Sequence, residues 1–152
     1  MNCKHIGFVR SPFKEGVDEG WGSVVSEICV DKQYADGLLG IGSFSHIIIV
    51  YEMHKAKWDI ATDLVRRPQG RAEFPLLGIF AQRAKHRPNP VGITAVKLLG
   101  VEGNLLKVQG LDAIDGTPVI DIKPYYPPFD RVETPRTPDW VDKVMAVYFS
   151  GE

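Results

Sequence analysis

The hydrophobic residues of this chain occur in short runs that are separated by turn-forming residues. The strongest run is Phe44–His54, which has four consecutive β-branched residues in its middle and polar residues toward its ends. This pattern predicts a central strand that is buried on both faces. Shorter runs bounded by Gly, Pro or Asn predict further strands at Lys4–Arg10, Val24–Val30, Leu76–Arg83, Ile93–Val101, Leu105–Gln109 and Pro118–Lys123.

One segment near the C-terminus has a helical pattern instead. Thr137, Pro138 and Asp139 supply a capping hydroxyl, a proline for the first turn and an acid near the positive end of the helix dipole. The apolar residues that follow lie at helical spacing and predict an amphipathic helix packed on the sheet. They are Val141, Val144, Met145 and Tyr148.

The segments between these elements are polar and rich in turn residues. Glu15–Gly22 is acidic and Gly-rich, which predicts a mobile loop with Trp21 as its anchor. Asp31–Gly42 is expected to be a turn region with one helical turn, and Lys55–Phe74 a long surface loop. Together the patterns predict a mostly β fold, namely a small closed or partly open β-barrel with a C-terminal helix and long loops.

Length and composition fit one globular unit. The chain has 152 residues, of which 44% are hydrophobic and 24% charged, so a single domain over residues 1–152 with a real core is expected. The longest apolar run is far short of a membrane span, and the N-terminus has no apolar signal core, which favours a soluble cytoplasmic protein. Two cysteines give no disulfide framework, and Cys3-Lys4-His5 has no second ligand cluster, so no metal is expected.

The charge is distributed unevenly along the chain. The net charge is −1, yet the segment from Lys55 to Lys97 contains nine basic and three acidic residues, a net of +6. The remainder carries −7. This asymmetry is typical of a face that binds a polyanion on an otherwise acidic body, although a solvated surface with chance clustering gives the same count.

Two joints between predicted strands carry the candidate chemistry. In Arg87-Pro88-Asn89-Pro90-Val91-Gly92 the prolines hold Arg87 and Asn89 in extended geometry, so that a rigid loop presents both side chains. In the segment LDAIDGTP, Asp112 and Asp115 stand three residues apart before a Gly. The two carboxylates either bind a ligand or only bond turn amides.

These joints resemble a known family. RPNPVGIT and GLDAIDGTPVIDIKPYYP, preceded by IGFVRSPFKE and FSHIIIVYEMH, are similar to the TrmO (TsaA-like) family of S-adenosylmethionine-dependent tRNA methyltransferases. The resemblance runs from about Ile6 to Pro127. It implies a small β-barrel enzyme that works as a homodimer and methylates the exocyclic N6 of a modified, threonylcarbamoyl adenosine beside the tRNA anticodon. The family would place a Pro-Arg-Gln-Pro-Gly-like segment near Asp18–Gly22, where this chain has DEGWG.

The chemistry of S-adenosylmethionine assigns roles to several residues. Asp112 or Asp115 can accept from its hydroxyls or ammonium, Arg83 can clamp its carboxylate, and Ile93 and Ile114 can cover its adenine. The resemblance implies the cofactor contacts Met53, His54, Arg83, Ile93, Leu111, Asp112, Ala113 and Ile114.

Methyl transfer to an amine also needs a proton acceptor and a surface for the acceptor molecule. Asp115, His86 and His54 are candidates for the proton acceptor, and the sequence does not choose between them. The residues suited to tRNA, on its phosphates or an unpaired base, are Arg87, Asn89, Lys123 and Tyr125. The alternatives are a non-catalytic β-barrel module that binds a nucleotide or RNA, and a methyltransferase with a different acceptor.

Overall fold

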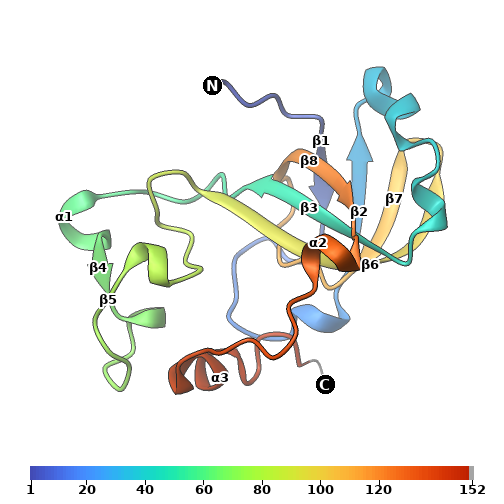
Figure 1. Ribbon diagram of the computed structural model, residues 1–152. Coiled ribbons are helices and arrows are strands. Elements are labelled where there is room, and N and C mark those ends of the chain that lie inside the picture. Colours follow the sequence, from blue (N-terminus) through green and yellow to red (C-terminus); the bar gives the residue numbers. More distant parts are fainter. Residues whose placement is uncertain (151–152) are drawn as a thin grey trace.

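Six strands close into an antiparallel barrel in the computed structural model, which describes residues 1–150 (Figure 1). The predicted fold class is therefore confirmed. In the order in which neighbours pair, the strands are β1 (Gly7–Arg10), β2 (Val25–Val30), β7 (Leu105–Gln109), β6 (Val91–Glu102), β3 (His46–Glu52) and β8 (Pro118–Pro124), which returns to β1.

The barrel interior is filled by branched aliphatic side chains. Successive residues of a strand point to opposite faces, so every second residue of each strand enters the interior. A barrel of about this size leaves room for little besides its own side chains. The fully or nearly fully buried residues of this core include Val9, Ile28, Ile47, Ile49, Val96, Leu106, Val108 and Val119.

Strand β3 is buried on one face only, so the prediction of two buried faces is wrong. Ile47, Ile49 and Tyr51 are buried, whereas Ile48 and Val50 between them are only partly covered. A run of β-branched residues does not show which face is covered. In a closed barrel one face of each strand points outward, and here little covers the outer face of β3.

A lobe formed by residues 55–90 extends to one side of the barrel (Figure 1). The predicted strand Leu76–Arg83 lies in this lobe, and only Leu77–Gly78 of it forms a strand. The side chain of Gln82 turns back and donates to the carbonyls of Arg66 and Leu77, which bends the chain away from a longer strand. The lobe contains α1 (Ile60–Asp63), β4 (Val65–Arg66), the 3-10 helix Pro68–Gly70, β5 (Leu77–Gly78) and the 3-10 helix Ile79–Ala81.

Short helices form most of the remaining connections. The expected turn region after β2 contains the 3-10 helices Lys32–Leu38 and Ile41–Ser43, and Trp21–Ser23 forms a third before β2. Beyond β8 lie α2 (Pro127–Asp130) and α3 (Asp139–Met145), the predicted C-terminal helix.

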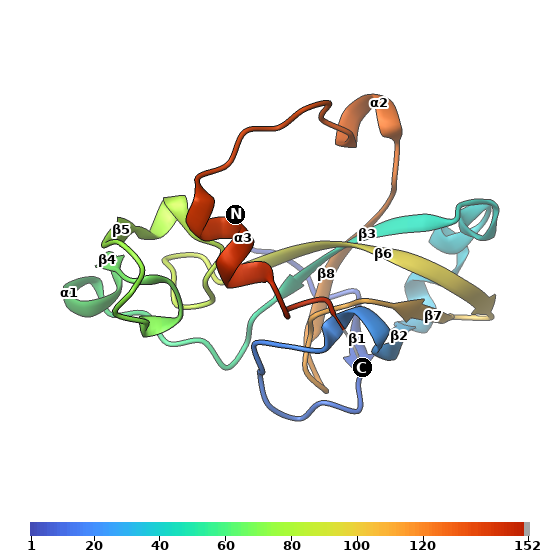
Figure 2. The same cartoon turned by 90° about the horizontal axis from the view of Figure 1, so that it is seen from below.

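Helix α3 begins at the expected place but does not pack on the sheet, so this part of the prediction is wrong. Its N-cap residue is Pro138 and no side chain caps it, and none of its residues is buried. Figure 2 shows α3 outside the ring of strands, beside the junction of lobe and barrel. The residues after it make the tertiary contacts instead: Gly20 and Trp21 donate main-chain hydrogen bonds to the carbonyls of Val147 and Tyr148.

Gly92 is expected to be indispensable for the barrel because Tyr51, its cross-strand partner, lies against it. A Cβ at Gly92 would overlap the Tyr51 ring. Gly92→Ala should therefore lower the free energy of unfolding by about 1–3 kcal/mol, measured by urea denaturation. Gly78→Ala is the matched control, because a Cβ there meets nothing within 4 Å. Equal stability of the two variants would contradict the packing argument.

Candidate functional site

The carboxylate of Asp112 accepts hydrogen bonds from three hydroxyl groups at one end of the barrel. Tyr51 donates to Oδ1 over 3.0 Å, and Thr94 donates to the same oxygen. Tyr148 donates to Oδ2 over 2.7 Å. Tyr51 and Thr94 come from β3 and β6 and are 4% and 9% exposed, whereas Tyr148 comes from the segment after α3. We call Asp112 with these three hydroxyls the carboxylate cluster.

The carboxylate cluster keeps its two phenols neutral. Burial, and then the negative charge of Asp112, raises the pKa of the Tyr51 hydroxyl well above its usual value. The same two causes, in the same order, raise the pKa of Tyr148. Both phenols are hydrogen-bond donors at neutral pH, and the raised pKa values extend this state further into alkali. The charge of Asp112 is stabilised by the dipoles of the hydroxyls that donate to it.

The two motifs singled out in the sequence meet at this cluster. Alternation along β6 points Gly92 and Thr94 inward and leaves Ile93 between them 52% exposed. Burial alternates in the same way along the LDAID segment. Leu111 and Ala113 are buried, whereas Asp112 and Ile114 are half-exposed. The barrel thus anchors the backbone of both motifs and leaves one side chain of each available.

Arg83 lies beside the exposed edge of this site. Its Nη2 donates to the carbonyl of Ile93 over 2.6 Å, which fixes the guanidinium next to β6. The side chain is exposed, so its remaining N–H groups are accessible to a ligand. Arg83 thus bonds to Ile93, the residue before Thr94, which in turn donates to Asp112 of the LDAI segment.

Met53 and His54 follow directly after β3, close to the start of β6. The amide of Met53 donates to the carbonyl of Pro90 over 2.7 Å, and its side chain packs against the core. His54 is exposed, and its side chain makes no hydrogen bond within residues 1–150. Both lie at the end of β3 that carries Tyr51.

The N-terminal loop that departs from the family pattern is held in place at the same end. Trp21 is buried, donates from Nε1 to the carbonyl of Val17 over 2.8 Å and packs edge-on against Phe13 at 4.8 Å. The expectation that Trp21 anchors this loop is confirmed. Through its main chain, Trp21 also holds the segment that carries Tyr148.

Asp115 is engaged by different residues from those that hold Asp112. It accepts from the amide of Ser11 over 3.0 Å and from Lys14 Nζ over 2.6 Å. The bond from Lys14, and then that from Ser11, lowers the pKa of the Asp115 carboxyl. Asp115 lines a shallow hollow of about 650 Å³ on the outer side of β1 and β2, and Asp112 is not among the lining residues.

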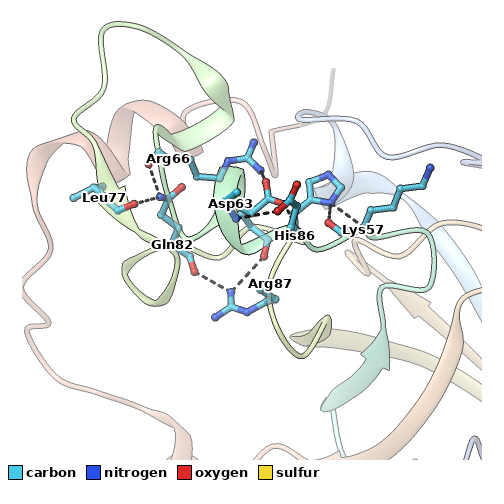
Figure 3. Close-up of polar contacts among 10 residues, drawn as sticks. Lys57, Asp63, Arg66, Leu77, Gln82, His86 and Arg87 are labelled. Carbon is cyan, nitrogen blue, oxygen red and sulfur yellow. Dashed lines mark hydrogen bonds and ion pairs between the residues drawn. The ribbon is translucent and has the colours of Figure 1, made fainter.

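The His86 side chain is held by the main chain of Lys57, within the same lobe. Its Nδ1 lies 2.7 Å from the carbonyl oxygen and 3.1 Å from the amide nitrogen of Lys57 (Figure 3). The shorter contact fits a proton on Nδ1 that is donated to the carbonyl. Nε2 then carries the free lone pair of the ring.

The four residues proposed for tRNA fall into two groups. Arg87 and Asn89 precede β6, next to the site, and the Arg87 guanidinium donates to the carbonyls of Gln82 and Ala84 (Figure 3). Lys123 and Tyr125 lie at the other end of β3, where the Tyr125 amide donates to the His46 carbonyl. The seven residues of β3 place the groups roughly 20 Å apart, at about 3.3 Å per residue. The pKa of Lys123 is raised by its bond to Asp121.

Three residues of the site escaped the sequence analysis. Tyr51 lies within the strongest strand, Thr94 within a motif noted for its prolines and glycine, and Tyr148 within the predicted helix. Inward alternation along β3 and β6 is a signal that points to Tyr51 and Thr94, since a buried hydroxyl needs a partner. No comparable signal points to Tyr148, because it lies outside the strands, in the segment after α3.

The structure gives further findings on membranes and metals. Within residues 1–150 no helix combines the length and hydropathy that a membrane span requires. The same residues contain no group of three His, Cys, Asp or Glu side chains suitably placed to hold a metal ion.

Fold and site together define a small β-barrel with a polar site at its mouth. The chain belongs to the TrmO family: residues 9–131 match the family described as the tRNA-methyltransferase O N-terminal domain. This confirms the resemblance inferred from the motifs.

Relatives and solved structures support this membership. An S-adenosyl-L-methionine-binding protein of Archaeoglobus fulgidus is 47% identical over 136 residues, covering 87% of this chain and 94% of that protein. The tRNA (adenine(37)-N6)-methyltransferase of Escherichia coli is 37% identical, covering 82% of this chain and 57% of the enzyme. The crystal structure of TrmO from Pseudomonas aeruginosa matches 90% of this chain with a TM-score of 0.72 and 31% identity. This chain spans only 60% of that solved chain.

The raised tyrosine pKa values predict a stability loss in alkali. Because folding raises the pKa of Tyr51 and Tyr148, their stabilising contribution is full below the unfolded value of about 10 and declines as pH rises above it. In a titration followed by phenolate absorbance, two of the five tyrosines should ionise only as the protein unfolds. Tyr148→Phe should leave one such late group. Five tyrosines that ionise together near pH 10 would contradict the structure of the carboxylate cluster.

Proposed function

We propose that this protein is an S-adenosylmethionine-dependent methyltransferase that acts on the exocyclic N6 of a threonylcarbamoyl-modified adenosine beside the tRNA anticodon. The observation that carries the proposal is the convergence of Asp112, Arg83 and Ile93 at one mouth of the barrel in a member of the TrmO family. A relative named as a binder of S-adenosyl-L-methionine and one named as a tRNA methyltransferase support the cofactor and the reaction.

The groups present at the site fit the functional groups of S-adenosylmethionine. Asp112 Oδ2 is an acceptor for a hydroxyl or ammonium, and Arg83 is a donor for a carboxylate. Ile93 and Ile114 offer partly exposed apolar surface for a purine. Met53, His54 and the main chain from Leu111 to Ile114 would complete the contacts. When bound, the cofactor supplies a methyl carbon already activated by its sulfonium, so the protein contributes mainly alignment.

Removal of the amine proton is best assigned to His86 among the three candidates. Asp115 is a poor base because Lys14 and Ser11 bind its carboxylate and lower its pKa. His86 holds one ring nitrogen against the Lys57 carbonyl, which leaves the other as an oriented acceptor. His54 is adjacent to the cofactor contacts but has no partner within residues 1–150 to orient it.

We assign the contact with tRNA to the two groups at either end of β3. Arg87 and Asn89 adjoin the cofactor contacts, so they would lie nearest the reacting adenosine. Lys123 and Tyr125, at the other end, would bind a more distant part of the same RNA, with the lysine on phosphate and the tyrosine against a base.

The assay that tests the function uses purified protein, S-adenosylmethionine and tRNA that contains threonylcarbamoyl adenosine. Mass spectrometry of the digested nucleosides should show a 14-dalton increase on this nucleoside alone, the mass that one methyl group adds. Arg83→Ala should lower cofactor affinity by about tenfold or more, because a charge-assisted bond of about 1.5–3 kcal/mol is lost. Arg131→Ala, which changes an exposed arginine beside α2, is the matched control.

The outcomes separate the proposal from its alternatives. Methylation of another nucleoside or molecule, with the cofactor bound, would indicate a methyltransferase with a different acceptor. Binding of cofactor and RNA without any transfer would indicate a non-catalytic binding module.

We also propose that the protein works as a homodimer. The filled interior of the barrel forces the site to the outside, where a second copy can complete it. Apolar side chains are exposed on the adjoining surfaces and would be covered by such a copy. They include Val91 and Ile93 at the start of β6, and Ile60, Val65, Leu76 and Phe80 on the lobe.

Light scattering at micromolar concentration should give twice the mass of the chain, which is 16.9 kDa. Phe80 is 77% exposed in the single chain and would be buried in the dimer. Phe80→Glu should therefore shift the protein to the monomer, because the interface would bury an unpaired charge. Phe129→Glu changes an equally exposed ring beyond β8 and should leave the dimer intact. A wild-type monomer, or equal behaviour of the two variants, would contradict this dimer.

A further inference from the structure

The two oxygens of Asp112 differ in how firmly their partners are held. Oδ1 accepts from Tyr51 and Thr94, and both residues belong to strands of the barrel. Each carboxylate oxygen accepts about two hydrogen bonds, so Oδ1 is saturated by groups that cannot move away without opening the barrel. Among residues 1–150, Oδ2 accepts from Tyr148 alone. A ligand can therefore reach Asp112 only at Oδ2, either in the second acceptor position of this oxygen or in place of Tyr148.

The segment that carries Tyr148 is attached far more weakly than the strands. Val147 and Phe149 on either side of it are exposed, and α3 before it buries no residue. Two main-chain hydrogen bonds hold the segment, from Gly20 to Val147 over 3.2 Å and from Trp21 to Tyr148 over 2.9 Å. The carbonyl of Phe149 also lies so close to Gly22 that a side chain at position 22 would overlap it.

We propose that residues 147–149 form a strap in which the Tyr148 hydroxyl holds the place of a ligand donor on Asp112 Oδ2, and that the bound ligand displaces it. The strap is thus a self-inhibiting contact that lowers the apparent affinity of the site. This inference rests on the proposed cofactor role of Asp112. It adds Tyr148 as the residue that controls the access of a ligand to Asp112.

The chemistry of Oδ2 defines which ligand group displaces the strap. A carboxylate oxygen replaces a phenol donor only with another donor, so the displacing group is a hydroxyl, an ammonium or the adenine amine, and not a carboxylate. These donors occur in S-adenosylmethionine on its ribose, its amino acid and its adenine. Adenosine carries the ribose hydroxyls and the adenine amine, and methionine carries the ammonium, so the two fragments distinguish the nucleoside end of the cofactor from its amino-acid end.

The test compares cofactor affinity by calorimetry in variants of the full chain. Tyr148→Phe removes the competing hydroxyl and keeps the ring, and it should bind S-adenosylmethionine at least about tenfold more tightly, as expected for a lost bond to a charged group. Gly22→Ala should also tighten binding, because it displaces the strap and changes neither Tyr148 nor Asp112. Tyr34→Phe is the control, since the Tyr34 hydroxyl makes no hydrogen bond within residues 1–150. Circular dichroism checks that each variant is folded.

A second measurement follows the strap itself in the wild-type protein. Chymotrypsin cleaves after aromatic residues, so saturating cofactor should accelerate cleavage at Tyr148 and Phe149. Whichever fragment, adenosine or methionine, reproduces this acceleration carries the displacing donor. Protection by the cofactor would overturn the proposal, because it would mean that the strap closes on the ligand.

The remaining outcomes are also decisive. Unchanged or weaker binding by Tyr148→Phe, with normal binding by the wild type, would overturn the strap and leave the proposed cofactor role intact. If neither the wild type nor the variants bind S-adenosylmethionine, the cofactor role fails, and the strap fails with it.

Discussion

The arrangement of the site depends on one constraint, which is that the negative charge of Asp112 is stabilised by three hydroxyl donors and, within residues 1–150, by no ion pair. Hydrogen bonds to a charged group contribute about 1.5–3 kcal/mol each, and a charge left without donors would be costly in this partly buried position. Thr94 must therefore point inward from β6, and Tyr51 must reach across the barrel end from β3. The same constraint requires a glycine at position 92, because a side chain there would overlap the Tyr51 ring.

Closure of the barrel determines where a ligand can bind. Six strands bury a core of branched aliphatic side chains, so the polar groups able to meet a ligand lie at the ends of the barrel or on its outside. The lobe and the loops that adjoin the carboxylate cluster supply side chains that the strands of the barrel do not. Arg83 and His86 come from the lobe, and Trp21 and Tyr148 come from the loop before β2 and the segment after α3.

The sequence was sufficient for those parts of the fold in which local pattern and tertiary structure agree. Alternation and turn residues located the six barrel strands to within two or three residues, because the period of a strand is imposed by the same burial that defines the core. The strand expected at Leu76–Arg83 failed because side-chain bonds from Gln82 override an extended apolar run. Motifs identified Asp112, Arg83 and Ile93. They did not reveal Tyr148, whose position depends on main-chain contacts with a loop more than 120 residues earlier.

The basic segment from Lys55 to Lys97 acquires a more specific meaning from its contacts. Arg66 and Arg71 form ion pairs with acids of the same segment, and Lys55 pairs with Glu15. By contrast, Arg67, Arg83 and Arg87 donate to main-chain carbonyls.

A carbonyl orients a guanidinium but carries no net charge, so these three arginines are fixed in place and remain positive. Their field therefore extends beyond the surface by about a Debye length, roughly 8–10 Å at ordinary salt concentrations. Oriented positive charges that form no ion pair within residues 1–150 are the property that a site for a polyanion needs, and net charge alone conceals them.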